Sequence, residues 1–386
     1  MNKLTHTIEA LRYKANTIRF MNKDHRFLTH YLVIESDDWG SIRMPSTEVL
    51  RFLESKGYRF AEQKGYDRYD TLASKEDLES LIDALSSVKD SIGNPAKMTM
   101  NCVVANPDFD RIRQSNYQEY HFELFTETLK RYPHHDRSFP LWREGMNCGV
   151  FHPQFHGREH LNVLMWLRLL QEGYQPIRES FKRCVFSTQV DYSVDERKHS
   201  LAAFNIADAS EYDFVTTSVK EGLDIFEKLF GYRSVSMIAP NYTWDIQIEN
   251  AAFSSGVKYF QGARNQRHSL YAMRQGHNTE FRYTGQRNKN NQIYMVRNCF
   301  FEPSEDPKKN ADFCLAQVDR CFKTGQAAII SSHRQNFIGE LYPSNRDNNT
   351  GQFIRLLKTI VTKYPDVVFV SSDELGAILD HQTRND

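Results

Sequence analysis

Short apolar segments alternate with helical segments along almost the whole 386-residue chain. The apolar segments have the length of strands, and the segments between them repeat their apolar residues at helical spacing. We expect strands at 30–36, 97–106, 147–156, 233–240, 258–262, 327–333 and 366–372, and helices at 7–22, 76–93, 120–132, 157–174, 219–232, 246–257, 311–326, 350–365 and 373–379. This alternation predicts the α/β class, with a parallel sheet or barrel inside a layer of helices.

The chain shows no internal repeat and no convincing linker. We therefore expect a single domain over 1–386, with an N-terminal helical region at 1–27 and a core at about 28–380. The polar and basic stretch at about 262–296 predicts an inserted loop or hairpin.

Composition excludes several classes of function. The 49 basic and 49 acidic residues give a formal net charge of zero, so no global field favours nucleic acid or an anionic membrane. The six cysteines form no C-x-x-C pair, which excludes the usual metal-thiolate spacing. The first thirty residues lack the apolar region of a signal peptide, and no apolar run is long enough to span a bilayer. We expect a soluble cytoplasmic protein with free thiols.

Polar residues of catalytic type follow several of the expected strands. Asp37 and Asp38 end the first, the segment HPQFHGREH continues another, and His333 ends a strongly apolar one. The carboxyl ends of parallel strands lie on one face of a barrel, where active sites are found. Residues far apart in sequence are therefore expected to converge there.

The histidines predict a metal site. His156 and His160 are four residues apart at a strand-to-helix junction, so both imidazoles would point the same way if the helix began near residue 156. A carboxylate from the first strand would complete a His-His-Asp site with open positions for water and substrate. By strand parity His152 would face the same side, as an additional ligand or a partner of one.

The adjacent aspartates fit such a site if the strand turns at its end. One carboxylate would bind the metal and the other would remain free as a general base. His333 would protonate a leaving group or stabilise an oxyanion. Each feature also has an ordinary structural explanation, since Asp-Asp pairs and single histidines are common in turns and caps.

In this order, the motifs resemble those of the polysaccharide deacetylase family, the NodB-like group also called carbohydrate esterase family four. The matching segments are Ser36–Gly40 for the T-F-D-D-G motif, His156–Leu161 for H-[ST]-x-x-H, Ile238–Tyr242 for the Pro-containing motif, and Ile329–His333 for the final His motif. The resemblance covers roughly residues 28–380. It implies a distorted (β/α) barrel, a divalent metal, and hydrolysis of an N- or O-acetyl group on a sugar.

The resemblance also implies roles for individual residues. Asp37 corresponds to the base and His333 to the acid, while the backbone N–H of Tyr242 corresponds to an oxyanion donor. The implied metal ligands are Asp38, His156 and His160, and zinc is the expected metal, with cobalt or nickel as alternatives. The residues expected to contact or surround the substrate are Trp39, His152, Asn241 and Arg334.

Two departures from the family pattern affect these expectations. Ile238 stands where the family has an arginine that orients the base, so either Arg43, Arg143 or Arg334 is expected to replace it, or the pKa of Asp37 is set in a different way. Trp39 separates the aspartates from Gly40, and we expect it to stack on a sugar or to cover the metal. The expected substrate is an oligosaccharide or glycan precursor.

Two other hypotheses remain open at this stage. A glycoside hydrolase on a related barrel would need two carboxylates about 5 to 10 Å apart, and Asp37 with Glu159 or Asp245 could supply them. A sugar-binding protein with a decayed deacetylase site would bind saccharide without turnover. The oligomeric state stays open as well.

Overall fold

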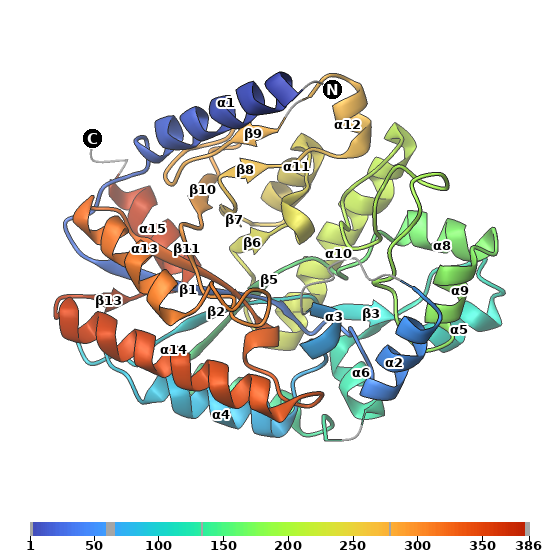
Figure 1. The fold of residues 1–386 in the computed structure, drawn as a ribbon, viewed down its shortest axis with the longest axis horizontal. Helices are drawn as coiled ribbons and strands as arrows, with labels where there is room; N and C mark the ends of the chain where they lie inside the picture. Colours follow the sequence, from blue (N-terminus) through green and yellow to red (C-terminus); the bar gives the residue numbers. More distant parts are fainter. Residues whose placement is uncertain (1–2, 59–65, 133, 278, 383–386) are drawn as a thin grey trace.

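A curled parallel sheet forms the centre of the protein in the computed structural model, which describes residues 3–58, 66–132, 134–277 and 279–382 (Figure 1). Its strands follow the order β10-β7-β6-β5-β2-β1-β12-β11, and β13 also pairs with β1. Every pairing in this sheet is parallel. The strands are β1 (Tyr31–Trp39), β2 (Met98–Cys102), β5 (Phe151–Phe155), β6 (Ser236–Ile238), β7 (Tyr259–Gly262), β10 (Ile293–Val296), β11 (Cys299–Phe300), β12 (Ala328–His333) and β13 (Val368–Phe369).

One segment connects the two edges of this sheet. Ile293–Val296 pair with β7 at one edge, and Cys299–Phe300 pair with β12 at the other. Only Arg297 and Asn298 lie between β10 and β11, and three residue steps span at most about 11 Å. The sheet therefore curls until its edges almost meet, and Arg297 lies at the seam. The α/β barrel predicted from the sequence is confirmed.

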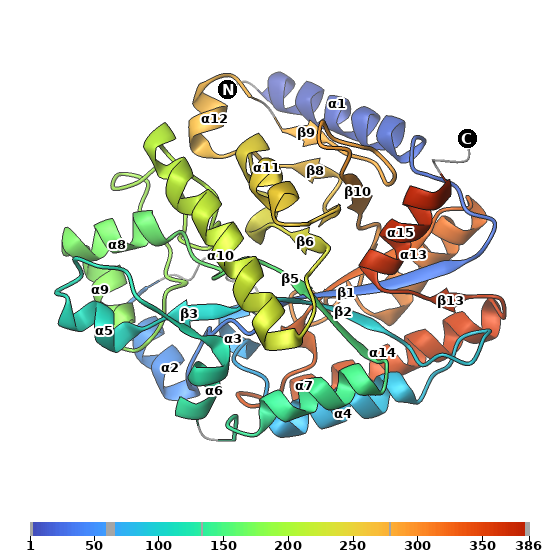
Figure 2. The same cartoon turned by 180° about the vertical axis from the view of Figure 1, so that it is seen from behind.

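Helices surround the sheet, as the two opposite views show (Figures 1 and 2). Helices α4, α7 and α14 pack together on one side, while α10 and α11 pack together elsewhere. The longer helices are α1 (Lys3–Met21), α2 (Thr47–Ser55), α4 (Lys75–Ser86), α7 (Ser138–Asn147), α8 (Val163–Gln171), α10 (Tyr212–Phe230), α11 (Ile246–Ser254), α13 (Ala311–Lys323), α14 (Pro343–Lys363) and α15 (Ser372–Gln382). The shorter helices are α3 (Tyr66–Tyr69), α5 (Phe109–Gln114), α6 (Phe125–Arg131), α9 (Gln175–Phe181) and α12 (Leu270–Arg274).

Strand β1 is buried on both faces. Leu32, Val33 and Ile34 are all fully buried, which explains why the strand is a continuous apolar run without alternation. Side chains of the surrounding helices cover one face of β1, and the other face of β1 points into the barrel interior. This burial fixes the register of β1 and hence the place of the carboxylates at its end.

Several predicted elements differ in extent from the structure. The predicted helix 120–132 begins as a strand, β4 (Phe122–Leu124), because Phe122 and Leu124 alternate with Glu123 and pair with β3 (Ala105–Pro107). The predicted helix 76–93 ends at Ser86, and Asp90 then accepts the backbone N–H groups of Ile92 and Asn94 in a turn.

The stretch 262–296 combines an insertion with part of the barrel. It contains the predicted hairpin, formed by β8 (Asn265–Gln266) and β9 (Glu280–Phe281), with α12 between them. Helix α1 lies beside β9, and the rings of Tyr13 and Phe20 contact Phe281. The prediction missed β10, which belongs to the main sheet.

All six cysteines have free thiols, as expected, and four of them are buried. Within the described residues, no helix is both long and apolar enough to cross a membrane.

Candidate metal centre

The candidate site lies at the carboxyl ends of the barrel strands, where β1, β5 and β12 place the polar residues singled out by the sequence. Three potential metal ligands meet there. One ligand atom from each of Asp38, His156 and His160 lies within 4.8 Å of the others, and all three residues are buried. The oxygen Oδ1 of Asp38 is 3.3 Å from Nε2 of His156 and 3.4 Å from Nε2 of His160.

The backbone of β1 explains how two adjacent aspartates serve one site. Glu35 and Asp37 are two residues apart and share one face of the strand. Asp38 would face the opposite side, but its φ of 71° is left-handed, and the register with β2 shifts between Ser36 and Trp39. The predicted strand ends at Ser36, just before the aspartates. In the structure it continues through Trp39, with this irregularity in its backbone.

The two histidines converge without sharing a helix. Helix α8 begins at Val163, after Asn162 as its N-cap, so both His156 and His160 precede it. The predicted helical i,i+4 arrangement is therefore wrong. A turn at Gly157, with φ of 105°, redirects the chain just after β5 and brings His160 back towards His156.

The hydrogen bonds of the cluster suit metal binding. Nδ1 of His156 lies 3.0 Å from the carbonyl oxygen of Ile238, which assigns its proton to Nδ1 and leaves the Nε2 lone pair for a cation. Burial lowers the pKa of His160 well below its usual value, so this imidazole is neutral at pH 7. Two imidazoles and a carboxylate form a donor set typical of zinc.

The second oxygen of Asp38 faces away from the histidines. It accepts a hydrogen bond of 3.1 Å from Arg43, whose Nε lies 3.5 Å from Asp70. Burial would raise the pKa of Asp38, but Arg43 and the histidines outweigh it and hold this pKa well below its usual value. Arg334 donates to Asp70 from the other side. A buried chain of charges thus orients the carboxylate.

Arg297 holds the neighbouring Asp37, and the sequence interpretation missed it. Its Nη1 and Nη2 donate to the two oxygens of Asp37 at 2.6 Å each, while its Nε donates to Glu35 at 2.5 Å. Burial opposes ionisation of Asp37, but Arg297 lowers its pKa to about 2. Asn101 donates a further hydrogen bond of 2.8 Å to Asp37.

The three arginines expected in this role lie elsewhere. Arg43 and Arg334 bind Asp70, as described above, and Arg143 is exposed on α7 beside Phe139. The sequence did contain a signal for Arg297. The apolar run Ile293–Val296 ends one residue before it, which is the pattern of a barrel strand followed by a site residue.

His333 completes the group on the other side of Asp37. Its Nε2 is 3.8 Å from Asp37, and its Nδ1 is 2.6 Å from Glu302. Burial lowers the pKa of His333, but Glu302 and the aspartates raise it more, so that it lies well above its usual value. The side chain is 20% exposed, which lets a protonated imidazole reach a bound molecule. Sequence reasoning had not identified Glu302.

The contacts of Tyr242 differ from the expectation. Its backbone N–H donates to the carbonyl oxygen of Ala239 at 3.0 Å, so this N–H is not free to act as the expected oxyanion donor. Its hydroxyl instead lies 3.2 Å from Nη1 of Arg297, beside Asp37. The neighbouring Asn241 has a φ of 54°, and its amide nitrogen lies 3.3 Å from His199.

Three other expected substrate contacts are not supported by the structure. Trp39 is 1% exposed, and its Nε1 donates to Ser36, so it is a core residue and not a stacking surface or a cover. Arg334 is fully buried against Asp70. His152 lies near the start of β5 and binds Asp373 of α15 at 2.9 Å, so it does not join the metal cluster.

The carboxylates considered for a glycoside hydrolase are engaged elsewhere. Glu159 is buried in an ion pair of 2.6 Å with Arg158. Asp245 accepts hydrogen bonds from Tyr212 and from the backbone of Ser269, and it lies 3.1 Å from His268.

No protein-family model and no curated protein matches the sequence. Among solved structures, a Mycobacterium smegmatis protein assigned to the polysaccharide deacetylases is 10% identical, with a TM-score of 0.47 over 92% of this chain and 91% of its own. A family 4 carbohydrate esterase from Streptomyces lividans is 8% identical, with a TM-score of 0.37 over 88% and 91%.

A 4-α-glucanotransferase from Thermococcus litoralis is 7% identical, with a TM-score of 0.44. The match covers 90% of this chain but only 40% of the glucanotransferase. Polysaccharide deacetylases are thus among the solved structures to which the chain is similar. At TM-scores below 0.5, the function has to be inferred from the site itself.

Proposed function

We propose that the protein is a metal-dependent hydrolase that removes an N- or O-acetyl group from a carbohydrate. One observation carries this proposal: the buried cluster of Asp38, His156 and His160, with the separate carboxylate Asp37 beside it. A metal site with three protein ligands leaves coordination positions open, which is the arrangement of catalytic rather than structural zinc.

The three ligands would hold a divalent ion, with zinc as first choice and cobalt or nickel as alternatives. When bound, such an ion polarises a carbonyl oxygen and lowers the pKa of water. Hydrogen bonds within the protein already hold the ligand side chains in place. Arg43 fixes one oxygen of Asp38, and the Ile238 carbonyl fixes the ring of His156, so the ligand atoms already face one another.

Asp37 would act as the general base. Arg297 and Asn101 keep it ionised and fix its orientation, so that it can accept a proton from the attacking water. A pKa of about 2 makes it a weak base. Its contribution therefore depends on position and on electrostatic stabilisation of the proton that it receives.

His333 would act as the general acid. Glu302 binds its Nδ1 and supports the protonated form, so that Nε2 can donate a proton to the departing amine or alkoxide. The Tyr242 hydroxyl, next to Arg297, would donate a hydrogen bond to the developing oxyanion. This assigns to the hydroxyl the role that the sequence had given to the backbone N–H.

A carbohydrate substrate is supported by the four sequence motifs and by the names of the similar solved structures. An oligosaccharide or glycan precursor remains our preferred substrate. Hydrolysis would release acetate and leave every glycosidic bond intact. This distinguishes the proposal from a glycoside hydrolase, which would create new reducing ends.

The first experiment compares the metal content of the wild type with that of Asp38→Ala and of Asp83→Ala, an exposed aspartate of α4. We expect about one equivalent of metal in the wild type and in Asp83→Ala, and almost none in Asp38→Ala. A screen of acetylated saccharides then measures acetate release by the same three proteins. A wild type that contains no metal, and takes up none after incubation with zinc, cobalt or nickel, would rule out the proposed mechanism.

A further inference from the structure

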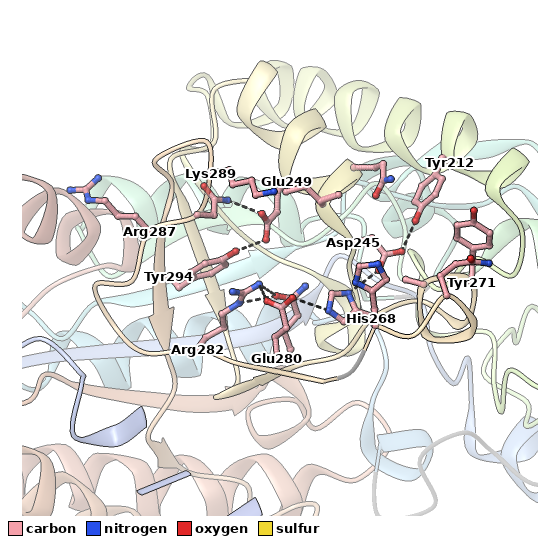
Figure 3. Close-up of a pocket in the computed structure, with 17 residues that line it drawn as sticks. Tyr212, Asp245, Glu249, His268, Tyr271, Glu280, Arg282, Arg287, Lys289 and Tyr294 are labelled. Atoms are coloured by element: carbon pink, nitrogen blue, oxygen red, sulfur yellow. Dashed lines mark hydrogen bonds and ion pairs between the residues drawn. The ribbon is translucent and has the colours of Figure 1, made fainter. Parts of the chain in front are cut away.

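A cavity lies outside the metal centre. It has a volume of about 550 Å³ and is enclosed by α10, α11, α12, the β8–β9 hairpin and β10 (Figure 3). This size falls within the range of about 300–1,000 Å³ found for small-molecule sites. None of its lining residues belongs to the metal cluster or to the groups around Asp37.

The cavity wall is polar and aromatic. Among the described lining residues only Ile246 and Ala272 are aliphatic, so the apolar part of the wall comes mainly from aromatic rings and from the methylene groups of polar side chains. The other lining residues are tyrosines, histidines, amides and charged groups, among them Tyr212, His268, Tyr271, Arg282, Lys289 and Tyr294. Such a wall suits a ligand that has both an apolar face and polar groups.

The carboxylates of the cavity are already occupied by donors of the protein. Glu249 accepts hydrogen bonds from Trp244 at 3.0 Å, from Tyr294 at 2.5 Å and from Asn288 at 2.9 Å. Asp245 and Glu280 are bound in the same way, with His268 lying between them. The carboxylates therefore have little remaining capacity to bind a ligand.

Two positively charged side chains, Lys289 and Arg282, keep more capacity to bind a ligand than the carboxylates do. Lys289 is exposed and has no ion-pair partner among the described residues. Arg282 uses Nε and Nη2 for Gln266 and Glu280, and its guanidinium lies 4.4 Å from the ring centre of Tyr294. His268 does not share this capacity: Asp245 and Glu280 raise its pKa to about 9, and these two carboxylates already face its two ring nitrogens.

The cavity has two chemically different ends. Figure 3 shows Arg287, Lys289 and Tyr294 at one end and Tyr212 and Tyr271 at the other. The rings of Tyr212 and Tyr271 meet edge to face at 5.8 Å. An aromatic ring face at one end can pack against the C–H face of a sugar ring, while the cations at the other end attract an anion.

We propose that this cavity binds a saccharide that carries an anionic group, either a carboxylate or a phosphate. The sugar ring lies against Tyr271, and the anionic group lies at Lys289 and Arg282. The site is separate from the metal centre and its existence does not depend on the deacetylase proposal.

Calorimetric titration of the full-length protein with four probes tests this inference: glucuronic acid, glucose 6-phosphate, glucose and inorganic phosphate. We expect at least one acidic sugar to bind about ten-fold more tightly than both glucose and inorganic phosphate. The acidic sugar that binds better identifies the anionic group. The proposal would be overturned if glucose or inorganic phosphate bound as tightly as the acidic sugars. It would also be overturned if neither acidic sugar bound.

Variants locate the binding. Lys289→Glu and Tyr271→Ala should each lower the affinity for the acidic sugar about ten-fold or more. Lys358→Glu makes the same charge change at an exposed position of α14 and should leave the affinity unchanged. Asp38→Ala should also leave it unchanged. Loss of binding in Asp38→Ala, or full binding in both cavity variants, would place the sugar elsewhere and contradict the proposal.

Discussion

At the scale of residues, the candidate site depends on pairs of buried opposite charges. Arg297 is 1% exposed and lies between two carboxylates, those of Glu35 and Asp37. Conversely, the carboxylate of Asp70 lies between two arginines, Arg43 and Arg334. A buried ion pair is not a strong source of stability, but removal of one partner leaves an uncompensated charge. Arg297 and Arg43 therefore serve to orient Asp37 and Asp38, the two carboxylates that the proposed reaction uses.

Replacing Arg297 tests this orientation. Lysine keeps the charge but cannot bind both oxygens of Asp37 together with Glu35. We expect Arg297→Lys to lower kcat about 100-fold or more, to lower the free energy of unfolding by about 1–3 kcal/mol because buried carboxylate oxygens lose their donors, and to leave the metal content unchanged. Arg355→Lys, in an exposed pair with Asp312, is the matched control and should change neither property. Normal turnover in Arg297→Lys would exclude the positioning role.

The role of His333 predicts a specific dependence on pH. A general acid works in its protonated form, so activity is retained below its pKa and lost as the pH rises through it. Glu302 raises this pKa against the effect of burial. Glu302→Gln should therefore lower it and move the alkaline limb of the kcat profile to lower pH. An unchanged alkaline limb, measured with the variant fully loaded with metal, would exclude His333 as the acid.

At the scale of elements, two irregularities in the backbone build the metal cluster. The left-handed residue Asp38 turns its carboxylate towards the histidines, and the glycine turn after β5 brings His156 and His160 together. Neither feature follows from hydrophobic periodicity, which treats β1 and β5 as regular strands. The geometry of the site thus comes from the few residues at which the strands stop being regular.

Gly157 provides a test of this idea. A Cβ at this position would lie 3.2 Å from the Glu159 carbonyl, and the φ of 105° is unfavourable for alanine. Gly157→Ala should cost about 1–3 kcal/mol of stability and weaken metal binding. Gly173→Ala, with φ of 76° and open space around it, should cost stability but leave metal affinity intact. Equal metal affinities of the two variants would contradict the proposed role of the turn.

At the scale of the whole molecule, the alternation of strands and helices was enough to predict the parallel barrel. Apolar runs such as Leu32–Ile34 are buried on both faces, and local sequence encodes that burial directly. The expected convergence of Asp38, His156 and His160 follows from topology, because carboxyl ends of parallel strands share one face.

What escaped prediction depends on contacts between distant segments. The segment Ile293–Phe300 joins both edges of the sheet, but its short strands lie within a polar stretch that resembles an insertion. Arg297 was missed for this reason. Trp39 and Arg334 were misassigned because sequence alone does not distinguish a buried polar or aromatic side chain from one that faces a substrate.

The same barrel geometry predicts that metal binding stabilises the whole protein. The ligands come from β1 and from the loop after β5, which are separated by more than 100 residues, so an ion that binds the folded site cannot find these ligands together in the unfolded chain. At a free zinc concentration of 100 times its Kd, the native state should gain about 2.7 kcal/mol. Thermal unfolding with zinc and with a chelator measures this gain as a rise in Tm. The Tm of Asp83→Ala should rise like that of the wild type, whereas the Tm of Asp38→Ala should not respond. An equal rise in Asp38→Ala would mean that zinc binds elsewhere, and the assignment of the metal centre would be wrong.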